Sequence, residues 1–218
     1  MTSLRIIASL LLCTLIFSLY AEKEYCYFQA PASWDMQLFT CDDPVEVGFL
    51  GPANDTSRPN IYLSEEEVDC TLAEYVTSVK NLYKNNPHFT FKDIGALNTK
   101  SGKAHLAEIE STTKIGVIKM LQCIIVKDKR AYVLTGANAK KNFTDTHLEY
   151  LKTFKSAQIS KKPLEFITGA DLQKSVTELV DTAVSTKELA SLLDQKKELS
   201  PYLKKLLIDF HQKKLSSK

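Results

Sequence analysis

The side chains that most often carry out chemistry are scattered along this chain of 218 residues. The histidines form no helical pair and the cysteines have no zinc-site spacing, so the sequence predicts no metal centre. The acidic run 65–69 lacks the glycine turn of a calcium loop and is interpreted as a solvated strand end. No Gly-x-Ser-x-Gly elbow and no glycine-rich phosphate loop occurs. We therefore expect no catalytic residue and no cofactor, with an enzyme of unrecognised type as the alternative.

The first residues indicate the compartment in which any thiol chemistry would take place. Arg5 precedes an apolar run over residues 6–19, and Ala21 stands just before a charged stretch. This order is typical of a secretory signal peptide. The run is shorter than the roughly 20 residues that a membrane-spanning helix needs. We expect cleavage after Ala21 and a periplasmic or secreted protein, whereas an uncleaved membrane anchor is the alternative.

The four cysteines that follow this leader could form disulfides in an oxidising compartment, with three possible connectivities. If residues 25–29 and 34–40 form a hairpin, Cys26 and Cys41 lie opposite each other, which favours a Cys26–Cys41 bridge. A register shift of one residue would place the two thiols on opposite faces. Cys123 lies within an apolar run and is interpreted as a small buried side chain.

The charge balance excludes one large class of partner. Lysine and arginine together number 28 against 26 aspartates and glutamates, so the formal net charge is +2. Proteins that bind nucleic acid usually carry a strongly basic face, so we expect no nucleic-acid partner. The length suits one sizeable domain, or one domain with an appendage.

The pattern between residues 25 and 135 is mostly that of strands. Apolar and aromatic runs alternate there with turn signals, and the expected strands are 25–29, 36–40, 45–50, 61–63, 89–94, 104–111, 117–126 and 130–135. The run 117–126 is apolar on both faces in its second half. This pattern predicts a central strand that is covered on both sides.

Helices interrupt and follow these strands. Thr71 and Glu74 form a capping box, which predicts a helix that starts there. A second helix is expected to open at residue 142, with a buried stripe formed by Leu148, Leu151 and Phe154. The order of elements predicts an α+β fold in which helices cover a mainly antiparallel sheet.

The pattern changes after residue 159, where a polar break is followed by helical, lysine-rich sequence. Cap signals predict short amphipathic helices that start near residues 168, 185 and 200. Such helices bury little apolar surface by themselves, so their stripes need a neighbour. We expect a leader over 1–21, an α+β domain over 22–160 and a helical extension over 161–218.

The last helix has an apolar stripe that could meet several kinds of surface. The stripe consists of Leu203, Leu206, Leu207 and Phe210, and the surrounding sequence contains five lysines but only one acidic residue. The stripe could pack on the α+β domain, or bind a protein partner. A weak contact of this basic helix with an anionic membrane surface is the third alternative.

Four short motifs resemble those of the PsbP-like fold superfamily. They are Tyr27–Trp34 (YFQAPASW), Thr71–Tyr75 (TLAEY), Ala131–Gly136 (AYVLTG) and Phe154–Ile159 (FKSAQI). The resemblance covers about residues 24–160 and does not reach the helical extension. The metal-binding positions of the photosynthetic branch have no matching motif here. The resemblance implies a sheet domain that acts as a non-enzymatic binding or assembly module.

These observations predict an exported, non-catalytic accessory protein of the cell envelope that contacts an unknown protein partner. The alternative is a carrier of a small apolar ligand, with a cavity between the sheet and its covering helices. Trp34, the only tryptophan, is expected to pack in the core, with ligand stacking as the alternative.

Overall fold

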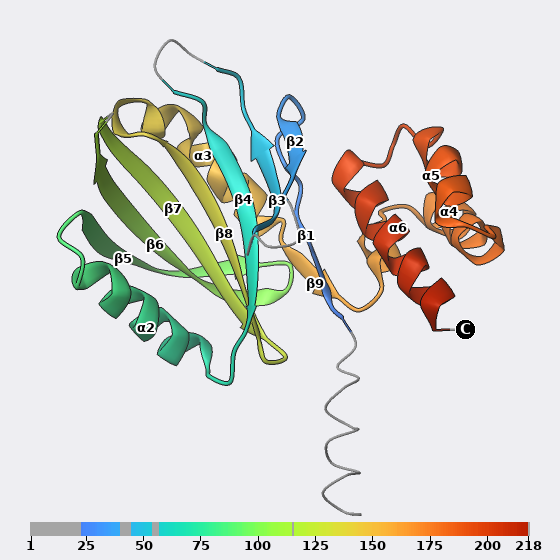
Figure 1. Ribbon diagram of the computed structural model, residues 1–218, viewed down its shortest axis with the longest axis horizontal. Helices are drawn as coiled ribbons and strands as arrows, with labels where there is room; N and C mark the ends of the chain where they lie inside the picture. The colour runs from blue at the N-terminus through green and yellow to red at the C-terminus, as the bar shows by residue number, and fades with distance from the viewer. Residues whose placement is uncertain (1–22, 40–44, 54–56, 115, 218) are drawn as a thin grey trace, which may run out of the picture.

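The computed structural model describes residues 23–39, 45–53, 57–114 and 116–217 (Figure 1). The expected leader, with its cleavage site after Ala21, lies outside the described residues, and so does Cys41.

Within the described residues, the main sheet has seven strands in the order β2-β3-β4-β8-β7-β6-β5, and every neighbouring pair is antiparallel. The strands are β2 (Asp35–Leu38), β3 (Val45–Leu50), β4 (Asn60–Glu67), β5 (Phe89–Thr99), β6 (Gly102–Thr113), β7 (Gly116–Lys127) and β8 (Arg130–Ala139). This arrangement confirms the α+β fold with a mainly antiparallel sheet.

Strand β7 lies between β6 and β8, and its residues 121–125 are all buried. Alternate side chains of a strand point to opposite faces, so this continuous burial requires a cover on each face of the sheet. The prediction of a central strand covered on both sides is confirmed.

Helix α2 (Leu72–Lys84) covers one face of the sheet. Its buried Val76 packs against Ile124 and Val133 of the sheet. The expected capping box is present, because the Glu74 backbone N–H donates to Thr71 Oγ1 at 3.3 Å and the Thr71 N–H donates to Glu74 Oε2 at 2.8 Å. These bonds satisfy orphan donors of the first helical turn.

Helix α3 (Phe143–Lys155), which follows the short 3-10 helix η2 (Lys140–Asn142), covers the other face. The expected buried stripe of α3 is partly wrong, because Leu148 is 67% exposed. Phe154 is buried and Leu151 is half-buried, as expected. The inward positions are Phe143, Thr146, Tyr150, Thr153 and Phe154. Large aromatic side chains at helical spacing therefore define the buried face of α3, and Leu148 lies outside it.

The short strands β1 (Tyr25–Tyr27) and β9 (Gln158–Ser160) form a separate antiparallel ribbon with Cys26 opposite Ile159. The predicted hairpin of residues 25–29 with 34–40 is wrong, because β1 pairs with β9 and β2 pairs with β3. A turn in which the Trp34 N–H donates to the Pro31 carbonyl at 3.1 Å separates β1 from β2. The geometric argument for a Cys26–Cys41 bridge is thereby removed, and Cys26 carries a buried free thiol.

The chain ends in the 3-10 helix η3 (Pro163–Phe166) and the helices α4 (Ala170–Thr182), α5 (Thr186–Asp194) and α6 (Pro201–Ser216). They stand beside β1 at one end of the molecule (Figure 1). Their buried residues join the same apolar cluster as those of the sheet. Among the described residues, no helix combines the length and the apolar character that crossing a membrane requires.

We predict that Gly136→Ala lowers the free energy of unfolding by about 2 kcal/mol, because overpacking a tight core has costs of this order. A Cβ atom at Gly136 would lie 2.5 Å from Cγ of the fully buried Tyr150 ring. Gly48→Ala is the matched control, because the atom that its Cβ would meet belongs to the half-exposed Phe39 side chain. Urea denaturation checks both variants, and an equal effect of the two would contradict the prediction.

Candidate functional site

A cleft of about 430 Å³ opens where β1, the start of β2 and the helical extension meet. We call it the aromatic cleft, because its lining includes Tyr27, Phe28, Trp34, Phe49, Phe166 and Tyr202. The first four of these residues come from the sheet side and the last two from the helical extension. The cleft therefore lies between the sheet side and the helical extension, and not between the sheet and its covering helices α2 and α3, where the carrier alternative placed a cavity.

The alternation of side chains along β1 builds one side of the cleft. Tyr27 stacks on Phe166 with a centroid distance of 5.4 Å and on Tyr202 at 5.8 Å. Tyr25 meets Phe210 edge-on at 6.2 Å. Cys26 points the opposite way, towards the main sheet, since adjacent side chains of a strand alternate. β1 is thus packed on both of its faces.

Tyr202 joins the helical extension to this strand. Its hydroxyl donates a buried hydrogen bond to the Cys26 carbonyl at 2.5 Å. Its ring also lies 5.2 Å from that of Phe28 and 6.0 Å from that of Phe49, between centroids. Burial raises the pKa of Tyr202 well above its ordinary value, so the phenol stays protonated and keeps donating.

The proposed partner-binding stripe of α6 is occupied within the molecule. Leu203, Leu206 and Leu207 are buried, and the partly buried Phe210 packs against the same cluster. The structure therefore shows the packing alternative for this stripe, in which the three leucines are buried and only Phe210 keeps part of its side chain exposed. The physical reason is that three short helices bury too little apolar area unless they use the sheet domain as a neighbour. Of the four residues, only Leu203 lines the aromatic cleft.

Trp34 combines the two roles that the sequence left open. It is 7% exposed and meets Tyr150 edge-on at 6.1 Å, as a core residue does. It also lines the aromatic cleft. Polar groups lie among the lining residues as well: Gln29, Thr168, Glu198 and Ser200. Apolar residues thus outnumber polar ones in the lining, although polar atoms contribute as much of the surface of the cleft as apolar atoms do.

Buried acidic groups lie beside the cleft, at the seam between β4, β1 and α6. The side chain of Glu65 is 6% exposed, and Arg130 lies 3.4 Å from its carboxylate. The pKa of Glu65 is raised to about 7, mainly by burial and also by nearby Glu46, whereas Lys23 and Arg130 act to lower it.

Glu24 is the second buried carboxyl of this seam. Its side chain is 8% exposed, Lys127 lies 3.6 Å away, and the Tyr132 hydroxyl donates to it at 3.4 Å. Burial also raises the pKa of Glu24.

The interpretation of residues 65–69 as a wholly solvated strand end is therefore wrong for Glu65. Its two-residue spacing from Ile61 and Leu63, both fully buried, is the signal that predicts an inward position.

Two of the three described cysteines are poorly suited to act as nucleophiles, and the third, Cys70, is half-buried. Cys26 and Cys123 are buried in the core, and Cys123 is the small buried residue that the sequence predicted. Burial raises the pKa of Cys123 to about 12, and it raises that of Cys26 well above its ordinary value. Both thiols therefore stay protonated, which makes them poor nucleophiles.

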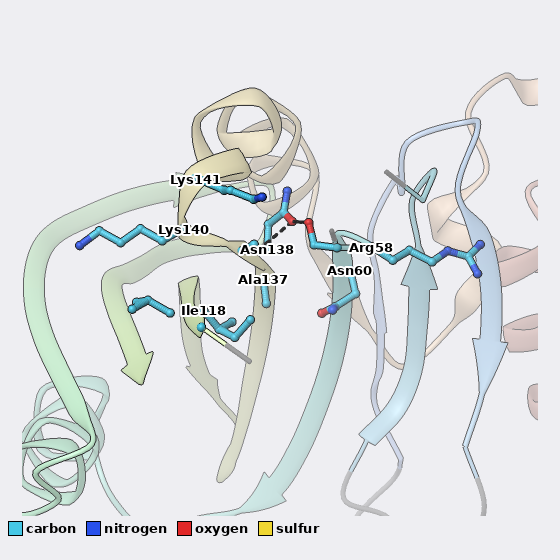
Figure 2. A pocket seen from close by; sticks show the side chains of 11 residues that line it. Arg58, Asn60, Ile118, Ala137, Asn138, Lys140 and Lys141 are labelled. Atoms are coloured by element: carbon cyan, nitrogen blue, oxygen red, sulfur yellow. Dashed lines mark hydrogen bonds between the residues drawn. The ribbon is translucent and has the colours of Figure 1, made fainter. Parts of the chain in front are cut away.

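A wider depression of about 880 Å³ lies beside the end of β8, next to η2 (Figure 2). Two of its three cations are engaged elsewhere, because Arg58 pairs with Asp35 at 2.6 Å and Lys140 pairs with Glu110 at 2.8 Å. Figure 2 shows these two side chains pointing away from each other. The Asn138 amide oxygen accepts a hydrogen bond from Ser57 at 2.8 Å. This depression has fewer convergent groups than the aromatic cleft.

The histidines stay apart in space as they do in sequence. His105 lies 3.0 Å from Asp93 at the β5–β6 edge, His211 lies 3.1 Å from the Ala183 carbonyl, His147 contacts the Phe143 ring, and His88 is exposed. Among the described residues, no three histidine, cysteine or acidic side chains form a group that could hold a metal ion.

No protein-family model matches the sequence, and no curated protein matches it significantly. Among solved structures, the chain is similar to LpqN, involved in cell envelope biogenesis of Mycobacterium tuberculosis, with 18% identity over 65% of this chain and 86% of that one, at a TM-score of 0.49. It is also similar to the cyanobacterial PsbP of Synechocystis, with 11% identity over 65% and 95% of the two chains, at a TM-score of 0.46.

We predict that the free energy of unfolding falls as the pH rises from about 5 to 8. Glu65 has a raised pKa of about 7 in the folded protein, so its neutral form stabilises the fold, and this contribution is lost as the carboxyl ionises. The full effect is about 3 kcal/mol. In Glu65→Gln this part of the pH dependence disappears, whereas in Glu67→Gln, which removes the exposed carboxylate bound to the same Arg130, it persists. Denaturant titrations across this pH range measure the slope, and an unchanged slope in Glu65→Gln would refute the assignment.

We predict that Tyr202→Phe lowers the free energy of unfolding by about 1–3 kcal/mol, because it removes the donor from a buried carbonyl. Tyr27→Phe is the control, since the Tyr27 hydroxyl lies 3.4 Å from Ser200 Oγ in a partly buried place and its loss has a smaller effect. Thermal unfolding of both variants tests the comparison. Equal stability of the two variants would show that the Tyr202 hydrogen bond does not fix the helical extension.

Proposed function

We propose that this chain is an exported, non-catalytic accessory protein of the cell envelope that binds a polypeptide partner in the aromatic cleft. The single observation that carries the proposal is the cleft itself, with its aromatic lining drawn from both the sheet and the helices. The leader pattern of the first 21 residues supports export.

The aromatic cleft is suited to binding because its aromatic side chains are already held in place. Tyr27, Phe28 and Phe49 each contact the Tyr202 ring, and Tyr202 is fixed by its hydrogen bond to the backbone of β1. Side chains fixed before binding lose little conformational freedom when a partner arrives. Aromatic residues in well-packed pockets also supply much of the energy of protein interfaces.

The surroundings of the cleft favour a polypeptide over a small molecule. Met36 of β2 lines the cleft, and Leu38 and Phe39, which follow it, are 58% and 44% exposed. Leu38 lies on the same face of β2 as Met36 and extends the apolar surface beyond the cleft, whereas Phe39 packs over Gly48 on the other face of the sheet.

A carrier of a small apolar ligand is the second candidate function. The observation in its favour is the volume of about 430 Å³, which falls within the range of small-molecule sites, about 300–1,000 Å³. In this case the ligand would occupy the cleft and leave Leu38 uncovered.

Site-specific photocrosslinking in the native cell envelope tests the proposal. A photoreactive amino acid replaces Thr168, an exposed residue that lines the cleft, and in a control protein it replaces Leu82, which is 70% exposed on α2. We predict a discrete polypeptide adduct from position 168 and none from position 82. A mass increase of small-molecule size at position 168 would support the carrier instead. The absence of any adduct specific to position 168 would reject both candidates.

A further inference from the structure

Strand β2 presents an open edge to the surroundings. It is the outermost strand of the main sheet, and among the described residues its backbone pairs with β3 alone (Figure 1). The backbone N–H and C=O groups that face away from β3 are therefore available to another chain. An extended polypeptide is the ligand that matches such a row of alternating donors and acceptors.

β5, the strand at the opposite edge of the sheet, is less suited than β2 to pair with another chain. β5 carries a bulge between Asp93 and Gly95, and its Lys92 and Asp93 are exposed. Bulges and edge lysines are devices that keep strands from pairing with foreign chains. β2 has a regular register with β3, and its one charged side chain, Asp35, is paired with Arg58.

The open edge of β2 adjoins the aromatic cleft. Met36 is the register partner of Phe49, and both residues line the cleft. Directly paired residues point to the same face of a sheet, so a strand added beside β2 would direct every second side chain to the face on which the cleft opens. The helical extension supplies Phe166, Leu172 and Tyr202 to the same cleft.

The charge of the cleft favours an occupant with a basic side chain. Glu198 is the only cleft residue with an ionised side chain; it is exposed, and no hydrogen bond or ion pair engages its carboxylate within the described part of the chain. A basic side chain on the partner would complement this carboxylate.

We propose that an extended segment of a partner polypeptide adds to the sheet beside β2, inserts an apolar side chain into the aromatic cleft and brings a lysine or arginine to Glu198. This inference rests on the proposed function and specifies the chemistry of its partner. The backbone of the segment binds β2, and its side chains determine selectivity.

Short synthetic peptides that alternate threonine with phenylalanine or valine, with lysine at both ends, serve as probes. Trp34 is the only tryptophan and lines the cleft, so its fluorescence reports binding to the full chain. Two N-methylated versions of the peptide each remove the backbone donors from one edge. We expect one version to lose affinity by at least about tenfold while the other version binds as the parent does, because only one edge pairs with β2. Glutamate in place of the terminal lysines should also weaken binding.

Matched protein variants locate the peptide. Leu38→Lys should weaken binding, whereas Leu148→Lys, at a comparably exposed position on α3, should not. Glu198→Gln should weaken binding of the lysine peptide and remove its preference over the glutamate peptide, and Glu178→Gln is the control on α4. Amide hydrogen exchange should slow at residues 35–38 and stay unchanged in β5.

One outcome is that the peptides change Trp34 fluorescence but neither N-methylation nor Leu38→Lys weakens their binding. This outcome would overturn strand addition, while binding of a polypeptide in the cleft would still stand. Protection at β5 in place of β2 would overturn strand addition as well. Failure of every peptide to bind would also overturn it, and the photocrosslinking result at position 168 would then decide separately whether the proposed function stands.

Discussion

The structure depends on the burial of one three-residue strand between two layers. β1 is buried along its whole length, with Tyr25 and Tyr27 against the helical extension and Cys26 towards the main sheet. Its only strand partner among the described residues is β9, from the far end of the α+β domain. The Tyr202 hydroxyl then ties α6 to the backbone of the same strand. Without β1, the helices would lose the aromatic contacts of Tyr25 and Tyr27, which help to complete their thin core.

This arrangement changes how the helical extension relates to the sheet. Residue 160 ends β9, so the place where the sequence changes character is itself paired with β1. The apolar cluster runs without interruption from Leu134 and Phe154 to Leu193 and Leu207. The change in sequence pattern therefore marks a change of secondary structure within one continuous core, and the aromatic cleft lies at the junction between the two parts.

The features that sequence could predict are those with local signals. Hydrogen bonds within one turn define the capping box of α2, and the continuous apolar run of β7 shows its burial directly. The β1–β9 pairing has no such signal, because it joins segments more than 130 residues apart and β1 is as short as a turn. The cleft has no local signal either, because its residues come from positions 27–36, 49 and 166–203 and only folding brings them together. Leu148 and Glu65 were misplaced because hydrophobicity alone does not say which side of an element faces the core.

The buried seam and the aromatic cleft are parts of one interaction system, because Tyr202 belongs to both. Burial is the main cause of the raised pKa of Tyr202, and the charge of Glu65 contributes to it. α6 carries one wall of the cleft through Tyr202, so the docking of α6 and the occupation of the cleft are linked. Binding equilibria linked in this way are reciprocal. An occupant that contacts the Tyr202 ring therefore stabilises the docked position of the helical extension, because its binding site is complete only when that extension is docked.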